Sequence, residues 1–100
     1  MSAVTEFMQI EDIISNVAHV TGISAAAICG PRRDEEVIEA RHIAMYLANR
    51  DGASYARIGR AMRRDHTTVM AGVRSIKAKM AEKPELRSVA NMAKEYANHA

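Results

Sequence analysis

The apolar residues of this chain recur at intervals of three and four along most of its length. The pattern is clearest in three stretches: Ile10, Ile13, Ile14 and Val17; Val69, Val73, Ile76 and Met80; and Leu86, Val89, Ala93 and Tyr96. Such spacing lines one face of an amphipathic α-helix. Aromatic residues make up only 4% of the 100 residues, whereas methionine, an unbranched helix former, occurs seven times. The sequence therefore predicts an all-α fold, a compact bundle of about six helices around one core.

Capping and turn residues set the expected helix ends. Ser24, Ser54 and Asp65 are suited to cap a helix N-terminus through their side chains, and Gly22 can end a helix. Pro84 fits the first turn of a last helix. The six expected helices cover roughly residues 10–21, 25–29, 35–49, 55–62, 66–81 and 84–97.

Positive charge is concentrated in one segment. Between residues 54 and 79, seven basic residues oppose a single acid, Asp65, although the net charge of the whole chain is only +2. A segment of this kind suits a polyanion, because each phosphate that it neutralises releases counterions. The sequence therefore favours nucleic acid as a binding partner.

The fourth and fifth expected helices form a helix-turn-helix pattern within residues 54–81. Only a short basic break separates them, and the second helix begins with the polar residues Asp65, His66 and Thr67. Such side chains can reach base edges in the major groove: a carboxylate accepts from the cytosine amino group, and threonine offers a hydroxyl and a methyl. The arginines on either side are suited to bind phosphate, namely Arg57, Arg63 and Arg64.

Two short strings in this segment, Ile58-Gly59-Arg60-Ala61 and Arg64-Asp65-His66-Thr67-Thr68-Val69, resemble the signature of the DNA-binding domain of the bacterial replication initiator DnaA. The resemblance continues upstream through residues 40–47 and Ile13-Ile14, and it covers roughly residues 9–82. It implies the fold of DnaA domain IV, a Trp-repressor-like helix-turn-helix. We expect a flexible tail over residues 1–8 and a single DNA-binding domain over residues 9–97, with the helix-turn-helix at 54–81 and a C-terminal helix at 84–97.

The resemblance also assigns expected roles on double-stranded DNA. Bases in the major groove would be contacted by Asp65, His66 and Thr67, with Tyr55 or Ala56 at a thymine methyl. Arg33 would enter the adjacent minor groove. Phosphates would be bound by Thr68 and by the pair Arg41-His42, in addition to Arg32 and the arginines around the turn.

The chain departs from the family pattern at several positions. The acidic stretch 34–36 follows Arg33, where the family loop is basic. The turn before Asp65 is one residue shorter and lacks the family's glycine, Gly72 lies inside the recognition helix, and Ala71 replaces a histidine. These differences bear on the target sequence more than on the mode of binding.

The sequence contains no Gly-x-x-x-x-Gly-Lys loop for nucleotide phosphates. We therefore expect a stand-alone DNA reader and not an ATPase, with no cofactor and no bound metal. His66 beside Asp65 resembles a general base with its orienting carboxylate, but no nucleophile accompanies them, so no enzyme is expected. No membrane span or signal peptide is expected, which leads to a cytoplasmic, nucleoid-associated protein.

Three functions follow from these expectations. The leading one is a bacterial or phage-type transcription regulator. The second is an accessory regulator of chromosomal replication initiation that binds DnaA-box-like origin sites. The third is a protein-interaction module that has lost DNA binding. RNA polymerase or a replication protein is a candidate second partner, through the acidic segment 1–29.

Overall fold

The computed structural model describes residues 9–99, and for residues 97–99 the backbone alone. The tail expected over residues 1–8 lies outside the described part. Within it the chain forms six helices and no strand: α1 Ile10–Thr21, α2 Ala25–Cys29, α3 Glu35–Arg50, α4 Tyr55–Met62, α5 His66–Glu82 and α6 Pro84–His99. The predicted all-α bundle is confirmed. The last helix extends two residues beyond its expected end at residue 97.

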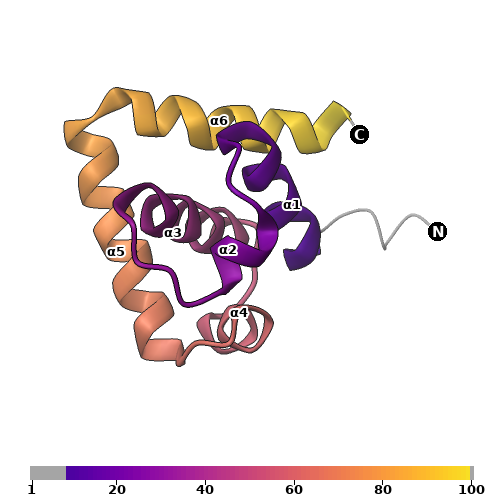
Figure 1. Cartoon of the computed structure of the whole chain (residues 1–100), viewed down its shortest axis with the longest axis vertical. Helices are drawn as coiled ribbons and strands as arrows, with labels where there is room; N and C mark the ends of the chain where they lie inside the picture. Colours follow the sequence, from indigo (N-terminus) through magenta and orange to yellow (C-terminus); the bar gives the residue numbers. More distant parts are fainter. Residues whose placement is uncertain (1–8, 100) are drawn as a thin grey trace.

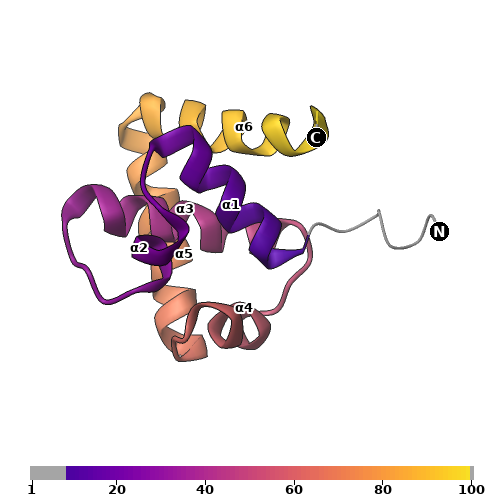
Figure 2. The same cartoon turned by 45° about the vertical axis from the view of Figure 1, so that its right-hand side comes forward.

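The helix α5 spans the longest dimension of the molecule, with α4 beside its first turns and α6 beside its last (Figure 1). The helix α3 lies in the middle and packs against both α1 and α5, and α1 also packs along α6. A second view shows the same separation of α4 and α6 (Figure 2). The bundle therefore has two distant ends, one formed by α4 with the start of α5, and the other by α6 with the end of α5.

The predicted apolar stripes form the core. The stretch from Ile10 to Val17 and the stretch from Val69 to Met80 each have all four of their apolar stripe residues buried. The third stretch is only partly inside, because Tyr96 is 42% exposed, against the expectation that it faces the core. Its ring instead stacks on the His19 ring of α1, with the centroids 4.3 Å apart. The ring of Tyr96 therefore covers part of α1 and remains partly in solvent.

Two of the three predicted side-chain caps at helix N-termini are present in the structure, and the third is not. The hydroxyls of Ser24 and Ser54 accept hydrogen bonds from the backbone N–H groups of Ala27 and Arg57, at 3.1 Å each. Asp65 also occupies an N-cap position with extended backbone, but its side chain makes no cap hydrogen bond. The prediction of a side-chain cap at Asp65 is therefore wrong.

Gly72 allows α3 and α5 to approach each other closely. A Cβ atom at this position would lie 2.8 Å from both the Cδ2 atom of His42 and the Sδ atom of Met45 on α3. Real Cβ atoms do not come so near to their neighbours, so alanine would force these side chains to move. The glycine that breaks the family pattern is thus matched to the packing of the recognition helix on α3.

Candidate nucleic-acid interface

The turn between α4 and α5 is tight, and two residues make it possible. Arg63 adopts the left-handed conformation, with φ 59° and ψ 46°, and it is the one non-glycine residue with positive φ in the described part. The next residue, Arg64, donates its backbone N–H to the carbonyl of Gly59 at 2.8 Å. A Cβ atom at Gly59 would clash with the carbonyl oxygen of Arg64. The turn therefore needs a glycine in α4, while an arginine takes the left-handed position that favours glycine.

The first turn of α5 is open to solvent. The side chains of His66, Thr67 and Thr68 are exposed, as is Asp65 just before them. The Asp65 carboxylate accepts a hydrogen bond of 2.7 Å from the Thr67 hydroxyl, which links two of the residues expected to read bases. These polar groups lie at one end of the described bundle (Figure 1).

A shallow hollow brings several of the expected site residues together. It lies between α4 and the start of α5 and is lined by Ala56, Gly59, Arg60, Arg63, Arg64, Asp65 and His66. Ala56 of α4, expected at a thymine methyl, thus shares a surface with two of the base-reading residues. Tyr55, the alternative for that contact, is half-buried at the start of α4.

Three exposed arginines surround this hollow or lie next to it. Arg60 and Arg63 line it, and Arg57 is one helical turn before Arg60 on α4. Arg60 was not among the expected site residues, although it belongs to the basic segment. Its spacing of three residues from both Arg57 and Arg63 could have assigned it to the same surface.

Arg41 does not lie on this surface. It is only 5% exposed, and its guanidinium donates to the backbone carbonyls of Ile28, Ala27, Gly30 and Arg32, at 2.6, 3.2, 3.0 and 2.9 Å. The last carbonyls of a helix have no partner within it, so Arg41 satisfies the end of α2. These bonds give Arg41 a structural role at the end of α2, and its expected contact with a DNA phosphate stays a prediction.

Arg64, in the turn between α4 and α5, also donates hydrogen bonds to backbone carbonyls near the end of α2. Its guanidinium donates to the carbonyl oxygens of Cys29 and Gly30, at 2.9 and 2.7 Å, and to that of Met62 at 2.9 Å. It therefore joins the helix-turn-helix turn to the end of α2. Arg64 is half-buried and also lines the hollow, so an additional contact with phosphate stays a prediction.

The loop between α2 and α3 carries the two arginines expected near the minor groove. Arg32 donates to both carboxylate oxygens of Asp34, at 3.2 and 3.1 Å, and this hydrogen bonding lowers the pKa of the Asp34 carboxyl. Because Asp34 neutralises part of the positive charge of Arg32, this arginine attracts phosphate less strongly. The neighbouring Arg33 is exposed.

His42 faces α5 from α3 and is half-buried near Gly72. Burial lowers the pKa of its imidazole, and the positive charges of Arg41, Lys79 and Arg64 lower it further. These effects disfavour the charged form of His42, and its expected contact with a phosphate stays a prediction.

In residues 9–99 no group of three or more His, Cys, Asp or Glu side chains is placed to hold a metal ion. No helix in the same part of the chain combines the length and the apolar character that a membrane span requires.

Comparison with known families agrees with the resemblance found in the sequence. Residues 10–76 match the family described as "Bacterial dnaA protein helix-turn-helix". The chain is 39% identical over 71 residues to chromosomal replication initiator protein DnaA 1 of Chlamydia pneumoniae, covering 70% of this chain and 15% of that protein. It is 35% identical over 88 residues to the DnaA protein of Thermomicrobium roseum, covering 86% of this chain and 19% of that protein.

A third relative is the DnaA protein of Bifidobacterium animalis subsp. lactis, 42% identical over 82 residues, or 80% of this chain and 14% of that protein. The chain therefore spans a small part of the length of each of these relatives.

Proposed function

Because this chain belongs to the bacterial DnaA helix-turn-helix family, we propose that it is a sequence-specific double-stranded DNA-binding regulator. The observation that carries the proposal is the exposed polar start of α5 beside a rim of exposed arginines. Short polar side chains at the start of a recognition helix read bases, and the arginines around them supply the phosphate contacts.

We assign the contacts as follows. The start of α5 enters the major groove, where Asp65, His66 and Thr67 meet base edges and Ala56 or Tyr55 meets a thymine methyl. Thr68, Arg57, Arg60 and Arg63 bind phosphates on either side, with Arg32, His42 and Arg64 in secondary contacts. Arg33 enters the neighbouring minor groove, where a narrow A·T-rich flank concentrates negative potential.

The carboxylate of Asp65 supports reading of sequence over general attraction to DNA. A negative charge close to phosphates lowers affinity unless it accepts a hydrogen bond from a base. Its hydrogen bond with the Thr67 hydroxyl holds the carboxylate at the tip of the helix, so both groups are positioned before DNA arrives.

The biological setting has two candidates, control of transcription and control of replication initiation. The three relatives named above are all called chromosomal replication initiator proteins, which favours the second. A genome-wide binding map tests this choice. Peaks confined to the replication origin support the replication role, whereas peaks spread over promoters support transcription.

Binding selection on a pool of random duplexes tests the proposal itself. We expect one short motif to be enriched by the full chain at physiological salt. Recovery of duplexes without a shared motif would contradict sequence-specific binding, and failure to retain any duplex would favour an interaction module that has lost DNA binding.

A further inference from the structure

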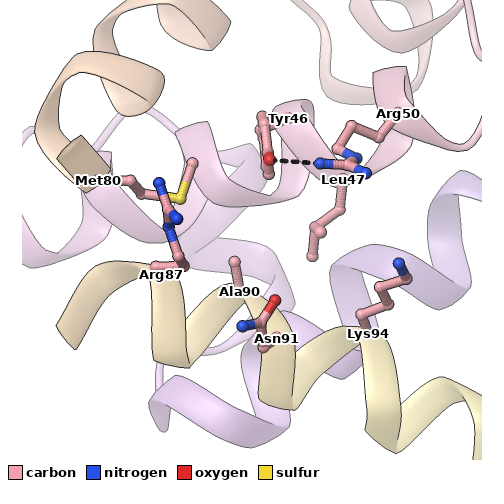
Figure 3. A pocket seen from close by; sticks show the side chains of 8 residues that line it. All are labelled: Tyr46, Leu47, Arg50, Met80, Arg87, Ala90, Asn91 and Lys94. Carbon is pink, nitrogen blue, oxygen red and sulfur yellow. Dashed lines mark hydrogen bonds between the residues drawn. The ribbon is translucent and has the colours of Figure 1, made fainter. Parts of the chain in front are cut away.

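A second basic site lies at the end of the bundle opposite the proposed interface. It is a cleft of about 100 Å³ between α6, the C-terminal half of α3 and the end of α5. Three of its eight lining residues are cationic, Arg50, Arg87 and Lys94, and none is acidic. Figure 3 shows these three side chains around the apolar residues Leu47 and Ala90 in the middle of the cleft.

The polar groups of the cleft are mainly hydrogen-bond donors. Arg50 donates to the Tyr46 hydroxyl at 3.0 Å, which leaves the hydroxyl proton for another acceptor. Arg87, Asn91 and Lys94 follow one another at helical spacing along one face of α6, and all three are exposed. A set of donors with positive charge is suited to an oxyanion, and arginine in particular matches the oxygens of phosphate.

The size of the cleft limits what can enter it. At roughly 30 Å³ for each water molecule in the liquid, the space holds about three waters. One phosphate group fits such a space. The charge and the size of the cleft therefore suit a single anionic group that belongs to a larger molecule or is free in solution.

The cleft lies well away from the start of α5 along the same helix. Met80, which lines the cleft, follows His66 by 14 residues (80 minus 66) on α5, or about 21 Å at 1.5 Å per residue. The major groove is about 8.5 Å deep, so a helix start that enters it meets phosphates near its own first turns. The helices α4 and α6 indeed lie at opposite ends of the molecule (Figure 1).

We propose that the cleft binds a backbone phosphate of a second DNA segment while the start of α5 occupies the first. This inference rests on the proposed function, because a protein already bound to DNA meets other segments at high local concentration. The carboxylates of Asp51 and Glu95 are close in sequence but do not line the cleft. Because Arg50, Arg87 and Lys94 are exposed, we expect the second contact to be sensitive to salt.

A duplex-capture experiment tests the second site. A duplex obtained by the binding selection is immobilised and saturated with the full chain, and a short fluorescent duplex is then added. The test variant is R87Q/K94Q, and the control K83Q removes an exposed cation that lies outside the basic segment 54–79 and does not line the cleft. We expect wild type and control to capture the second duplex equally, and R87Q/K94Q to capture it about five-fold less.

Binding of the first duplex should be the same for all three proteins, and thermal melts confirm that each is folded. Equal capture by R87Q/K94Q and wild type would overturn the proposal, and so would an absence of capture by wild type. Loss of first-duplex binding in R87Q/K94Q would place the cleft on the first duplex and overturn it as well.

Two further outcomes separate the alternatives. If a poly-glutamate peptide binds in a way that depends on Arg87 and Lys94 while duplex capture does not, the cleft is a site for an acidic protein and the proposal is wrong. A wild-type chain that does not bind the first duplex would overturn the proposed function together with this inference.

Discussion

Arg41 and Arg64 donate hydrogen bonds to the same backbone carbonyl, that of Gly30, at 3.0 and 2.7 Å. One arginine comes from α3 and the other from the helix-turn-helix turn. Burial lowers the pKa of the Arg41 guanidinium, and the nearby charge of Arg64 lowers it further. The two positive charges repel each other, and the hydrogen bonds to the carbonyl oxygens at the end of α2 offset this repulsion, because these oxygens carry partial negative charge.

The first prediction concerns the stability that these two side chains provide. Arg41→Ala should lower the free energy of unfolding by about 3 kcal/mol, since it leaves several buried carbonyls without partners. Arg64→Ala should cost less, because Arg64 is half-buried and water can replace part of its contacts. Urea unfolding of both variants measures these losses. A stable Arg41→Ala protein with weakened DNA binding would contradict this structural role and support the predicted phosphate contact instead.

The second prediction separates charge from backbone strain at Arg63. Arg63→Ala and Arg63→Gly should each reduce the slope of log affinity against log salt by about one, since both remove one phosphate contact. Arg63→Gly should be about 1 kcal/mol more stable than Arg63→Ala, because glycine adopts the left-handed conformation without strain. Salt titrations and thermal melts give the two quantities. An unchanged slope in both variants would remove Arg63 from the interface.

The third prediction concerns base reading at the start of α5. Thr67→Ala should lower specific affinity by about ten-fold, as expected for one lost base contact, and leave non-specific binding nearly unchanged. Asp65→Asn should relax the preference at one base pair. Ser75→Ala, an exposed position further along α5, is the control. Binding selections that return one identical motif for all four proteins would exclude this segment from sequence reading.

The fourth prediction is a pH dependence at His42. The folded state lowers the pKa of this imidazole, so below the ordinary histidine pKa of about 6.5 the unfolded chain binds a proton that the folded chain does not. Stability is therefore lost as the pH falls from 7 towards 5, and above pH 7 His42 has no effect of this kind. His42→Gln should lose less stability over this range than wild type. His66→Gln, at an exposed position, is the matched control. If wild type and His42→Gln show the same loss, the burial of His42 does not govern the pH response.

The fifth prediction compares two glycines in the recognition motif. Gly59→Ala should strongly destabilise the protein, because its Cβ would meet the backbone carbonyl of Arg64. Gly72→Ala should be tolerated better, since the atoms in its way belong to the side chains of His42 and Met45, and alanine gains up to about 1 kcal/mol of helix propensity. Thermal melts rank the two. A Gly59→Ala protein as stable as wild type would contradict the tight turn described here.

Local sequence signals predicted most of the fold. The apolar spacing correctly predicted which faces of α1 and α5 are buried, and Ser24 and Ser54 correctly predicted the starts of α2 and α4. Both features depend only on neighbours within a few residues of the sequence. The roles of Arg41 and Arg64 could not be predicted in this way. Their partners are backbone carbonyls 9 to 14 residues away for Arg41 and up to 35 residues away for Arg64, and a carbonyl has no sequence signature. Tyr96 was expected in the core because helical periodicity identifies one face of α6 but does not show how far along the helix that face is covered.

The shared carbonyl of Gly30 has a consequence for how DNA is selected. It joins the loop that carries Arg33 to the turn that begins α5. Under the proposed binding mode these two elements enter neighbouring grooves, so the entropic cost of setting their separation is met when the chain folds and not when DNA binds. We then expect the protein to require a fixed spacing between the two sequences that it contacts. Inserting one base pair between the A·T-rich flank and the bases read by α5 would shift the minor groove out of reach of Arg33, even though each element's own sequence is intact.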